Sequence, residues 1–311
     1  MFKIKIENYE KINSICFSTS MINLSYYMSC KPETINNCLV VLSENIASGI
    51  NLELLDNYLI VSSKYKLGLL KRLSYKIGIR DKLLDILHDV IRKVDFVYGT
   101  DHGGFYFLYK NKPMVIFEDG DGNYRYKSIG KVKQIYNLFF GFNNLPFGFG
   151  NHVVELHVLK PSCIKRKVSK KCSIIPIDLN ESIRVARRIN LSEYSKTFSG
   201  SGILITQPLS EDRLVTESEK VNIYKEIVEK YKLSHIKPHP RELTDYSSIA
   251  KVIPKKIPVE VIFDDDYNCP LVVTLFSTAV DSIEEQNKNI KVIKLGSYGI
   301  LSLSSFLGEK K

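Results

Sequence analysis

The stretch KLLDILHDVIRKVDFVY, residues 82–98, carries the pattern that decides the fold. Its first part places apolar residues three and four positions apart, which is the spacing of one face of a helix. The run from Val94 to Tyr98 has the length and apolar character of a buried strand. A helix followed directly by a strand is the repeating unit of α/β proteins, so this stretch predicts a sheet covered by helices.

The same alternation extends in both directions along the chain. Residues 67–77 and 217–230 also have helical spacing. Apolar runs of strand length occur at residues 12–17, 38–42, 58–61, 113–117, 203–206, 233–237 and 271–276. The alternation predicts an α/β protein with mostly parallel strands and helices on both faces of the sheet, and with a second core that begins near Gly202.

A chain of 311 residues usually forms more than one domain. We place the first domain at residues 1–155 and the second at residues 156–311, where a basic linker of about 156–198 precedes the C-terminal core. A hydrophobic content of 44% is ordinary for a soluble globular protein. There is neither an apolar run of about 20 residues nor a signal peptide, which predicts a cytoplasmic protein. Six scattered cysteines without a C-x-x-C pair predict reduced thiols.

Most of the net charge of +10 lies in one middle segment. Between Lys160 and Asn190, nine basic residues accompany two acidic ones. One interpretation is a solvated linker, since charge runs are usually exposed. The other is a surface for an anionic membrane or a phosphorylated lipid-linked acceptor, where each basic residue contributes up to about 1 kcal/mol. No glycine-aromatic motif accompanies the charge, so nucleic acid is not an expected partner.

Polar residues follow three of the predicted strands at the point where each strand ends. Ligands of open α/β sheets bind at this edge, because helix N-termini and loop amides converge there. The three sets are Glu118-Asp119-Gly120, His239-Pro240 and Ser277-Thr278. They form the predicted site.

The histidine and the two hydroxyls each have two interpretations. Flanking prolines stiffen the turn at His239, where an imidazole can bind phosphate, protonate a leaving group or simply cap the strand end. Ser277 and Thr278 are either N-caps of a following helix or two hydroxyls aimed at one phosphate.

Acidic residues supply the candidate bases. Glu118 to Asn123 is not a calcium loop, because Tyr124 stands where that loop needs glycine. Its carboxylates either act as a general base or fix the turn. Glu211 and Asp212 either match the dipole of the next helix or act as a base at the edge of a cleft.

Two further acidic sites point to a nucleotide. Glu260 is placed like an early-helix residue, where a carboxylate can accept both hydroxyls of a ribose. Asp264 and Asp266 support a rival hypothesis, because an aspartate pair after an apolar run can hold a divalent metal that carries a nucleotide-sugar diphosphate.

The ordered motifs of the chain resemble those of the bacterial sialyltransferases of glycosyltransferase family 52, which include lipooligosaccharide and capsule sialyltransferases. The resemblance runs from about Ile12 to Ser282, and its specificity comes from the order and spacing of the motifs. The motifs are VVLSEN (40–45), FEDGDGN (117–123), ILITQPLSED (203–212), HPR (239–241) and FSTA (276–279).

This resemblance implies a GT-B-like fold, in which two Rossmann-type domains with parallel sheets face each other across a cleft and the C-terminal one holds CMP-sialic acid. The implied reaction is a metal-independent inverting displacement that needs no cofactor. A hydroxyl of a galactose-terminated oligosaccharide or glycolipid attacks the anomeric carbon, CMP leaves, and an α2,3 linkage is expected. The resemblance also allows a homodimer and peripheral contact with the inner membrane face.

Individual residues take roles from the same resemblance. His239 matches the histidine that contacts the phosphate and acts as the general acid, and Ser277 and Thr278 match the hydroxyls that hold the same phosphate. Glu260 matches the acidic residue near the ribose. Pro240 and Gln207 complete the expected donor-binding set.

The base stays open among three carboxylates. One lipooligosaccharide member of the family points to Glu211 or Asp212, whereas related sialyltransferase families point to Asp119. Two other functions are also open: a metal-dependent glycosyltransferase that uses Asp264 and Asp266, and a non-catalytic binder of anionic glycan or lipid.

Overall fold

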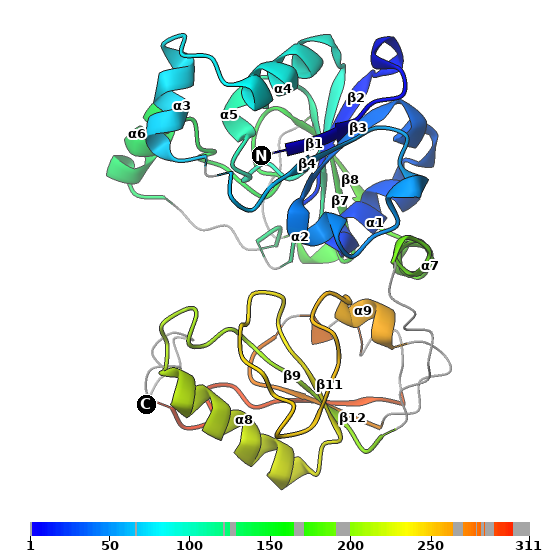
Figure 1. The fold of residues 1–311 in the computed structure, drawn as a ribbon, viewed down its shortest axis with the longest axis vertical. Coiled ribbons are helices and arrows are strands. Elements are labelled where there is room, and N and C mark those ends of the chain that lie inside the picture. Colours follow the sequence, from blue (N-terminus) through cyan, green and yellow to red (C-terminus); the bar gives the residue numbers. More distant parts are fainter. Residues whose placement is uncertain are drawn as a thin grey trace. The chain divides into compact units, whose positions relative to one another are not determined.

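The computed structural model describes residues 2–65, 67–120, 122–124, 129–164, 171–190, 200–263, 270–277, 279–280, 283 and 289–300. The chain divides into an N-terminal unit, Met1–Leu191, and a C-terminal unit, Ser192–Lys311. Figure 1 shows that each unit is a sheet covered by helices. The predicted α/β class is therefore confirmed.

An eight-stranded sheet in the order β1-β4-β3-β2-β5-β6-β7-β8 forms the N-terminal unit. β1 is antiparallel to β4, and the other neighbouring pairs are parallel. The strands are β1 Phe2–Lys5, β2 Ser14–Phe17, β3 Cys38–Ser43, β4 Tyr58–Val61, β5 Phe96–Gly99, β6 Met114–Phe117, β7 Val153–Val158 and β8 Ser173–Pro176.

Helices cover both faces of this sheet, because side chains alternate between two cores along each strand. On β2, Ile15 and Phe17 enter the core that is covered by α4 and α5, whereas Cys16 enters the core covered by α1 and α7. The helices are α1 Met21–Cys30, α2 Glu44–Ala47, α3 Leu69–Lys76, α4 Lys82–Lys93, α5 Tyr106–Tyr109, α6 Lys131–Phe140 and α7 Leu179–Ile189, with 3₁₀ turns η1 Tyr9–Lys11, η2 Pro32–Asn37, η3 Leu52–Leu54 and η4 Pro161–Cys163.

The cap and the apolar face of α4 explain why this helix forms. Asp81 caps it by accepting hydrogen bonds from the amides of Leu83 and Leu84, both at 3.1 Å. The apolar residues at three and four spacing are all buried: Leu83, Leu84, Leu87, Val90 and Ile91. The strand that follows it, β5, pairs with β2 and β6 in the middle of the sheet.

A five-stranded parallel sheet in the order β11-β10-β9-β12-β13 forms the C-terminal unit. Its long helix, α8, packs Tyr224 and Ile227 onto one face, and α9 packs Val259 and Ile262 onto the other. The elements are β9 Ile203–Ile205, α8 Glu217–Tyr231, β10 His235–Lys237, β11 Lys251–Val252, α9 Val259–Ile262, β12 Leu271–Thr274 and β13 Lys291–Lys294.

The boundary between the units lies later than the expected boundary after residue 155. β7, β8 and α7 occupy much of the segment that we expected to be linker, and β8 pairs with β7 at the edge of the N-terminal sheet. α7 packs against α1 through an apolar face that includes Val185 and Ile189. β8 was hidden in the sequence because it is four residues long and mostly exposed. Residues 165–170 and 191–199 of this segment lie outside the described residues.

Both sheets have the strand order of doubly wound nucleotide-binding folds. In each unit the order reverses beside the first parallel strand, between β2 and β5 in one and between β9 and β12 in the other. Ligands of such sheets bind at the carboxyl ends of the strands, at this switch point. The fold therefore predicts one ligand-binding site in each unit, at its switch point.

Candidate active site

Gln207 and Ser277 meet at the switch point of the C-terminal unit through the hydroxyl of Thr274. The side-chain amide of Gln207 donates to Thr274 Oγ1 at 2.8 Å, and the amide N–H of Ser277 donates to the same atom at 3.4 Å. Thr274 Oγ1 in turn donates to the carbonyl of Ile205 at 2.8 Å. Gln207 and Ser277, both predicted to bind the donor, are thus brought together by Thr274, which lies 67 positions after Gln207.

Gln207 retains one unused acceptor. Its side chain is only 6% exposed, and Oε1 has no hydrogen-bond partner among the described residues. Buried polar atoms are nearly always paired, so such an atom at a strand end indicates a place for a ligand or a water. An amide oxygen there can accept a hydrogen bond from an amino group or a hydroxyl.

A buried carboxylate holds His239 beside Thr206, the residue before Gln207. Glu242, which is 1% exposed, accepts the amide N–H of His239 at 2.7 Å and also accepts the hydroxyl of Thr206 at the end of β9. The amide of His239 lies 3.2 Å from the same Thr206 hydroxyl. The ends of β9 and β10 are therefore tied together at this histidine.

The hydrogen bonds of His239 also set its tautomer. Nδ1 accepts the amide N–H of Arg241 at 3.1 Å, so the hydrogen of the neutral ring is on Nε2. Burial, followed by the nearby positive charges of Arg241 and Lys237, lowers the pKa of His239 to about 4. At neutral pH the ring is an uncharged hydrogen-bond donor.

Lys237 is a functional candidate that sequence reasoning missed. It is 4% exposed, and its ammonium donates to the carbonyls of Pro238 and Lys255 at 2.8 and 3.2 Å. Burial lowers its pKa to about 8, against the opposing charges of Glu260 and Glu242. The sequence signal was a lysine inside an apolar strand, where charged residues are rare unless they are paired.

Two of the candidate bases are engaged in internal contacts. Glu211 accepts hydrogen bonds from the amide of Leu243 at 3.0 Å and from the buried ammonium of Lys220 at 3.0 and 3.1 Å. Burial would raise its pKa, but these donors outweigh burial and lower the pKa to about 2. Asp212 forms a two-bond ion pair with Arg241, at 2.7 and 3.0 Å.

The interpretation of these two carboxylates as first-turn helix residues is wrong. α8 begins at Glu217, its N-cap is Thr216, and its first-turn acids are Glu217 and Glu219. Thr216 and Glu219 form a reciprocal capping box, which places the start of the helix after the loop that contains Glu211 and Asp212.

Glu260 lies in the first turn of the short helix α9, as expected. Burial raises its pKa, and the positive charge of Lys237 opposes that rise. Pro240 follows His239 and is exposed. Thr278, Asp264 and Asp266 lie outside the described residues.

At the carboxyl ends of β2, β5 and β6, the N-terminal unit contains a second cluster, which is centred on Asp119. Its Oδ2 lies 3.0 Å from Nε2 of His102 and accepts the hydroxyl of Thr19 at 3.3 Å. Neighbouring side chains fix the turn. Asn123 accepts a hydrogen bond from the amide of Asp119 at 2.7 Å, and Glu118 accepts one from the amide of Leu159, also at 2.7 Å. The side chain of Asp119 takes no part in these two contacts of the turn.

His102 is the second residue that sequence reasoning missed. Burial would lower its pKa, but hydrogen bonds and charges from Asp101 and Asp119 raise that pKa to about 9. The ring is therefore cationic at neutral pH. The signal was present in the sequence, because Thr100, Asp101 and His102 directly follow a strand that ends at Gly99.

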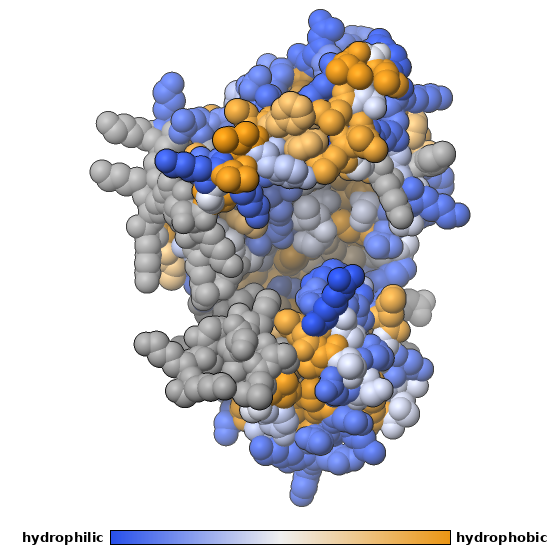
Figure 2. All heavy atoms as spheres, turned by 90° about the vertical axis from the view of Figure 1, so that its left-hand side faces the viewer, coloured by the Kyte–Doolittle hydropathy of each residue, from blue (hydrophilic) through white to orange (hydrophobic). Residues whose placement is uncertain are grey.

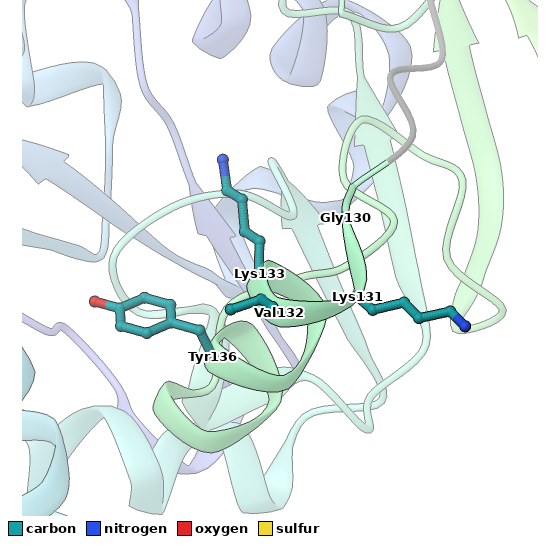
Figure 3. Close-up of a pocket in the computed structure, with 5 residues that line it drawn as sticks. All are labelled: Gly130, Lys131, Val132, Lys133 and Tyr136. Carbon is teal, nitrogen blue, oxygen red and sulfur yellow. The ribbon is translucent and has the colours of Figure 1, made fainter.

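A shallow surface pocket elsewhere in the N-terminal unit is not a candidate active site. Gly130, Lys131, Val132, Lys133 and Tyr136 line it at the start of α6 (Figure 3). This lining supplies two ammonium groups and a phenol but neither a carboxylate nor an imidazole. The pocket belongs to a surface of α3 and α6 on which exposed apolar side chains gather beside hydrophilic ones (Figure 2). The apolar ones include Leu70, Val132, Ile135, Leu138 and Phe139.

Two features are absent from the described residues. No group of three or more His, Cys, Asp or Glu side chains is placed to bind a metal ion. Within the same part of the chain, no helix combines the length and the apolar character that crossing a membrane requires.

Comparison with known proteins places this geometry in a family. The sequence model of glycosyltransferase family 52 matches residues 41–297. An uncharacterized protein of Haemophilus influenzae is 32% identical over 299 residues, which cover 89% of this chain and 92% of that protein. The solved structure of the spinosyn forosaminyltransferase SpnP aligns with a TM-score of 0.47 and 12% identity, over 96% of this chain and 83% of that one. The family match spans most of the chain, and the chain therefore belongs to glycosyltransferase family 52 and is a glycosyltransferase.

Proposed function

We propose that this glycosyltransferase moves sialic acid from CMP-sialic acid to a galactose-terminated glycan, by a metal-independent inverting displacement that forms an α2,3 linkage. One observation carries the proposal: the backbone amide of His239, whose imidazole is an uncharged donor, is bonded to Thr206 at the end of β9. The next residue, Gln207, meets Ser277 at the hydroxyl of Thr274, at the switch point of the C-terminal sheet. This arrangement suits a nucleotide with a single phosphate.

The donor site is argued from its hydrogen-bonding capacity. The Nε2–H of His239, after β10, can donate to a phosphate oxygen. Ser277 adds a hydroxyl after β12, on the other side of β9. Each hydrogen bond to a charged group contributes about 1.5 to 3 kcal/mol, so two or three of them hold a monophosphate. The unpaired Oε1 of Gln207 can accept the amino group of cytosine or a ribose hydroxyl.

Chemistry at the leaving group needs a proton that the free site does not hold. The pKa of His239 is about 4, so the ring is neutral when the donor arrives. The negative charge of the bound phosphate raises that pKa, because a nearby anion favours the imidazolium form. As the bond between the anomeric carbon and the phosphate oxygen breaks, His239 can then donate to the oxygen on which charge develops.

We assign the base to Asp119. Both oxygens of Glu211 accept from Lys220, and both oxygens of Asp212 accept from Arg241, whereas the described residues engage only Oδ2 of Asp119. A carboxylate with a pKa of about 2, such as Glu211, is also a weak proton acceptor. In the proposed step the acceptor oxygen forms a bond to the anomeric carbon, its proton passes to Asp119, and CMP leaves from the opposite face. Inversion follows from this single displacement.

The remaining partners belong to the proposal as well. No metal or other cofactor is needed, because a monophosphate leaving group carries less charge than the diphosphate that usually requires one. We propose a cytoplasmic enzyme that contacts an anionic membrane peripherally and that can form a homodimer. Arg184, Arg187 and Arg188 support the membrane contact, since all three are exposed on α7 while the apolar face of that helix is buried.

The decisive experiment is incubation with CMP-sialic acid and lactose, with CMP release measured by chromatography and the product linkage by NMR. We expect sialyllactose and CMP in equal amounts, unchanged by EDTA. Loss of turnover in EDTA with recovery in Mn²⁺ would instead support a metal site at Asp264 and Asp266. Absence of product across a panel of galactosides, with retained binding of anionic glycan or lipid, would overturn the proposal in favour of a non-catalytic binder.

A further inference from the structure

We propose that His102 is the positioning residue for Asp119: it holds Oδ2 of the carboxylate and leaves Oδ1 to receive the proton of the acceptor hydroxyl. This inference rests on the proposed function, in which Asp119 is the base. It adds a residue that neither the motifs nor the family match assigns.

The first support is that the two carboxylate oxygens of Asp119 have different contacts. His102 Nε2 and Thr19 Oγ1 both approach Oδ2 of Asp119, at 3.0 and 3.3 Å. No donor among the described residues makes a hydrogen bond to Oδ1. The Asp119 side chain is 28% exposed, so a ligand can reach this second oxygen.

The second support is that the histidine is itself held in place. Nδ1 of His102 lies 3.7 Å from Oδ1 of Asp101, whose side chain is fully buried. Asp101 cannot rotate freely, because its two oxygens accept the amides of Phe147 at 2.6 Å and Gly148 at 3.0 Å. A carboxylate at each ring nitrogen fixes the orientation of the imidazole.

An aromatic platform completes the arrangement. The rings of His102 and Phe147 lie 4.4 Å apart between centroids. Asn123 joins this platform to the Asp119 loop, since its side chain donates to the carbonyl of Phe147 at 3.2 Å and accepts the amide of Asp119 at 2.7 Å. Asp119, His102, Phe147 and Asn123 thus form a closed ring of contacts.

Two backbone features maintain this closed set of contacts among Asp119, His102, Phe147 and Asn123. Phe147 has a φ of +65°, a left-handed conformation that is unusual for an aromatic residue. At Gly122, a Cβ atom would lie 2.5 Å from the Phe147 ring, so only glycine lets the loop approach the platform. Strained backbone of this kind is concentrated at functional sites.

The same geometry separates the roles of histidine and aspartate. An imidazole with a carboxylate at each nitrogen is already protonated and cannot accept a further proton, in line with its pKa of about 9. The Nε2–H of His102 fixes the Asp119 carboxylate through Oδ2. The acceptor proton therefore goes to Oδ1 of Asp119 while the new carbon–oxygen bond forms, and His102 gains and loses nothing in the step.

The test compares His102→Ala, His102→Gln and the control His88→Ala in the sialyl-transfer assay. We expect His102→Ala to lower kcat about 10²-fold with little change in the KM for CMP-sialic acid, because a misplaced catalytic group costs about that much. His102→Gln restores part of the rate, since its amide can donate to the same Oδ2. His88 lies on α4, outside both clusters, and its substitution should leave kcat unchanged.

Two further measurements separate positioning from mere folding. The wild-type rate should fall as pH rises through about 9, and His102→Gln should lack this upper limb. In an Asp119→Asn background, His102→Ala should cost almost nothing more, since the histidine acts through the aspartate. An active wild type with full kcat in His102→Ala, or an additive double variant, would overturn this inference alone, whereas an inactive wild type would overturn the proposed function.

Discussion

Each sheet places a histidine just after the carboxyl end of a parallel strand, where ligands of such sheets bind, and the two histidines have opposite charge states. In the N-terminal unit His102 lies between two carboxylates, which raise its pKa to about 9. In the C-terminal unit burial and the cations Arg241 and Lys237 lower the pKa of His239 to about 4. One edge therefore offers a cation that fixes a carboxylate, and the other offers a neutral donor that suits a phosphate.

This difference shows that the surroundings, and not the residue type, decide what each histidine does. The imidazole has an unperturbed pKa of about 6.5, and neighbours within a few ångströms shift it in either direction. Placing the anion-paired histidine with the base and the neutral histidine with the phosphate assigns acceptor and donor chemistry to different units. The following predictions test that division.

The largest effect is expected at Asp119. Asp119→Asn removes the proposed base but keeps the size of the side chain, so kcat should fall about 10²- to 10⁴-fold. Asp212→Asn is the matched control and should change kcat only a few-fold, because Asp212 is paired with Arg241. Steady-state kinetics with CMP-sialic acid and lactose measure both, and the reverse ranking of the two variants would move the base to the C-terminal unit.

A somewhat smaller loss is expected at His239. His239→Ala removes a donor aimed at the charge that develops on the departing phosphate, and loss of one such donor costs about 10²- to 10³-fold in kcat. CMP affinity, measured by calorimetry, should weaken as well. Unchanged CMP binding together with unchanged turnover would remove this histidine from the donor site.

The buried carboxylate beneath His239 should matter for stability. Glu242→Gln places an amide where the site needs an acceptor for the Tyr246 hydroxyl, the Thr206 hydroxyl and the His239 amide. The free energy of unfolding should fall by about 1 to 3 kcal/mol, as for a buried group left unpaired. Chemical denaturation measures this loss, with the exposed Glu226→Gln on α8 as a control that should stay within experimental error.

The smallest effect is the pH dependence of stability, for which the two histidines have opposite signs. His102 has a raised folded pKa, so its contribution is complete below pH 6.5 and is lost as pH rises through about 9. His239 has a lowered folded pKa, so its contribution is present above pH 6.5 and is lost as pH falls toward about 4. Thermal melts of His102→Gln and His239→Gln should each flatten one side of the profile, and flattening of the same side by both variants would contradict the comparison.

Much of the fold could be predicted from the sequence because the responsible interactions are local. The apolar period of α4 and the runs that became β2, β3, β4, β6 and β12 are visible in short windows. The edge strands β1, β8, β11 and β13 were missed, since they are short, rich in polar residues and stabilised by their neighbours. β7 was missed as well, because it lies in the segment that was expected to hold the domain boundary. The boundary between the units was expected after residue 155 and lies after Leu191, because the short exposed strand β8 was not recognised as part of the N-terminal sheet.

The candidate site was predicted by position but not by environment. Asp119, His239 and Ser277 lie at strand ends as expected, whereas His102, Lys237 and Glu242 were missed because their importance comes from burial and pairing. Two long-range contacts illustrate this: Thr19 meets Asp119 across 100 positions, and Thr206 meets Glu242 across 36.

By itself, the order of apolar runs and strand-end polar residues determined that this protein is an α/β chain with polar residues at the carboxyl ends of its strands. Only the tertiary structure decided which histidine is charged, which carboxylates are already paired and which polar atoms are left for a ligand. The physical reason is that helices and strands follow from neighbours along the chain, whereas pKa values and hydrogen bonds follow from neighbours in space.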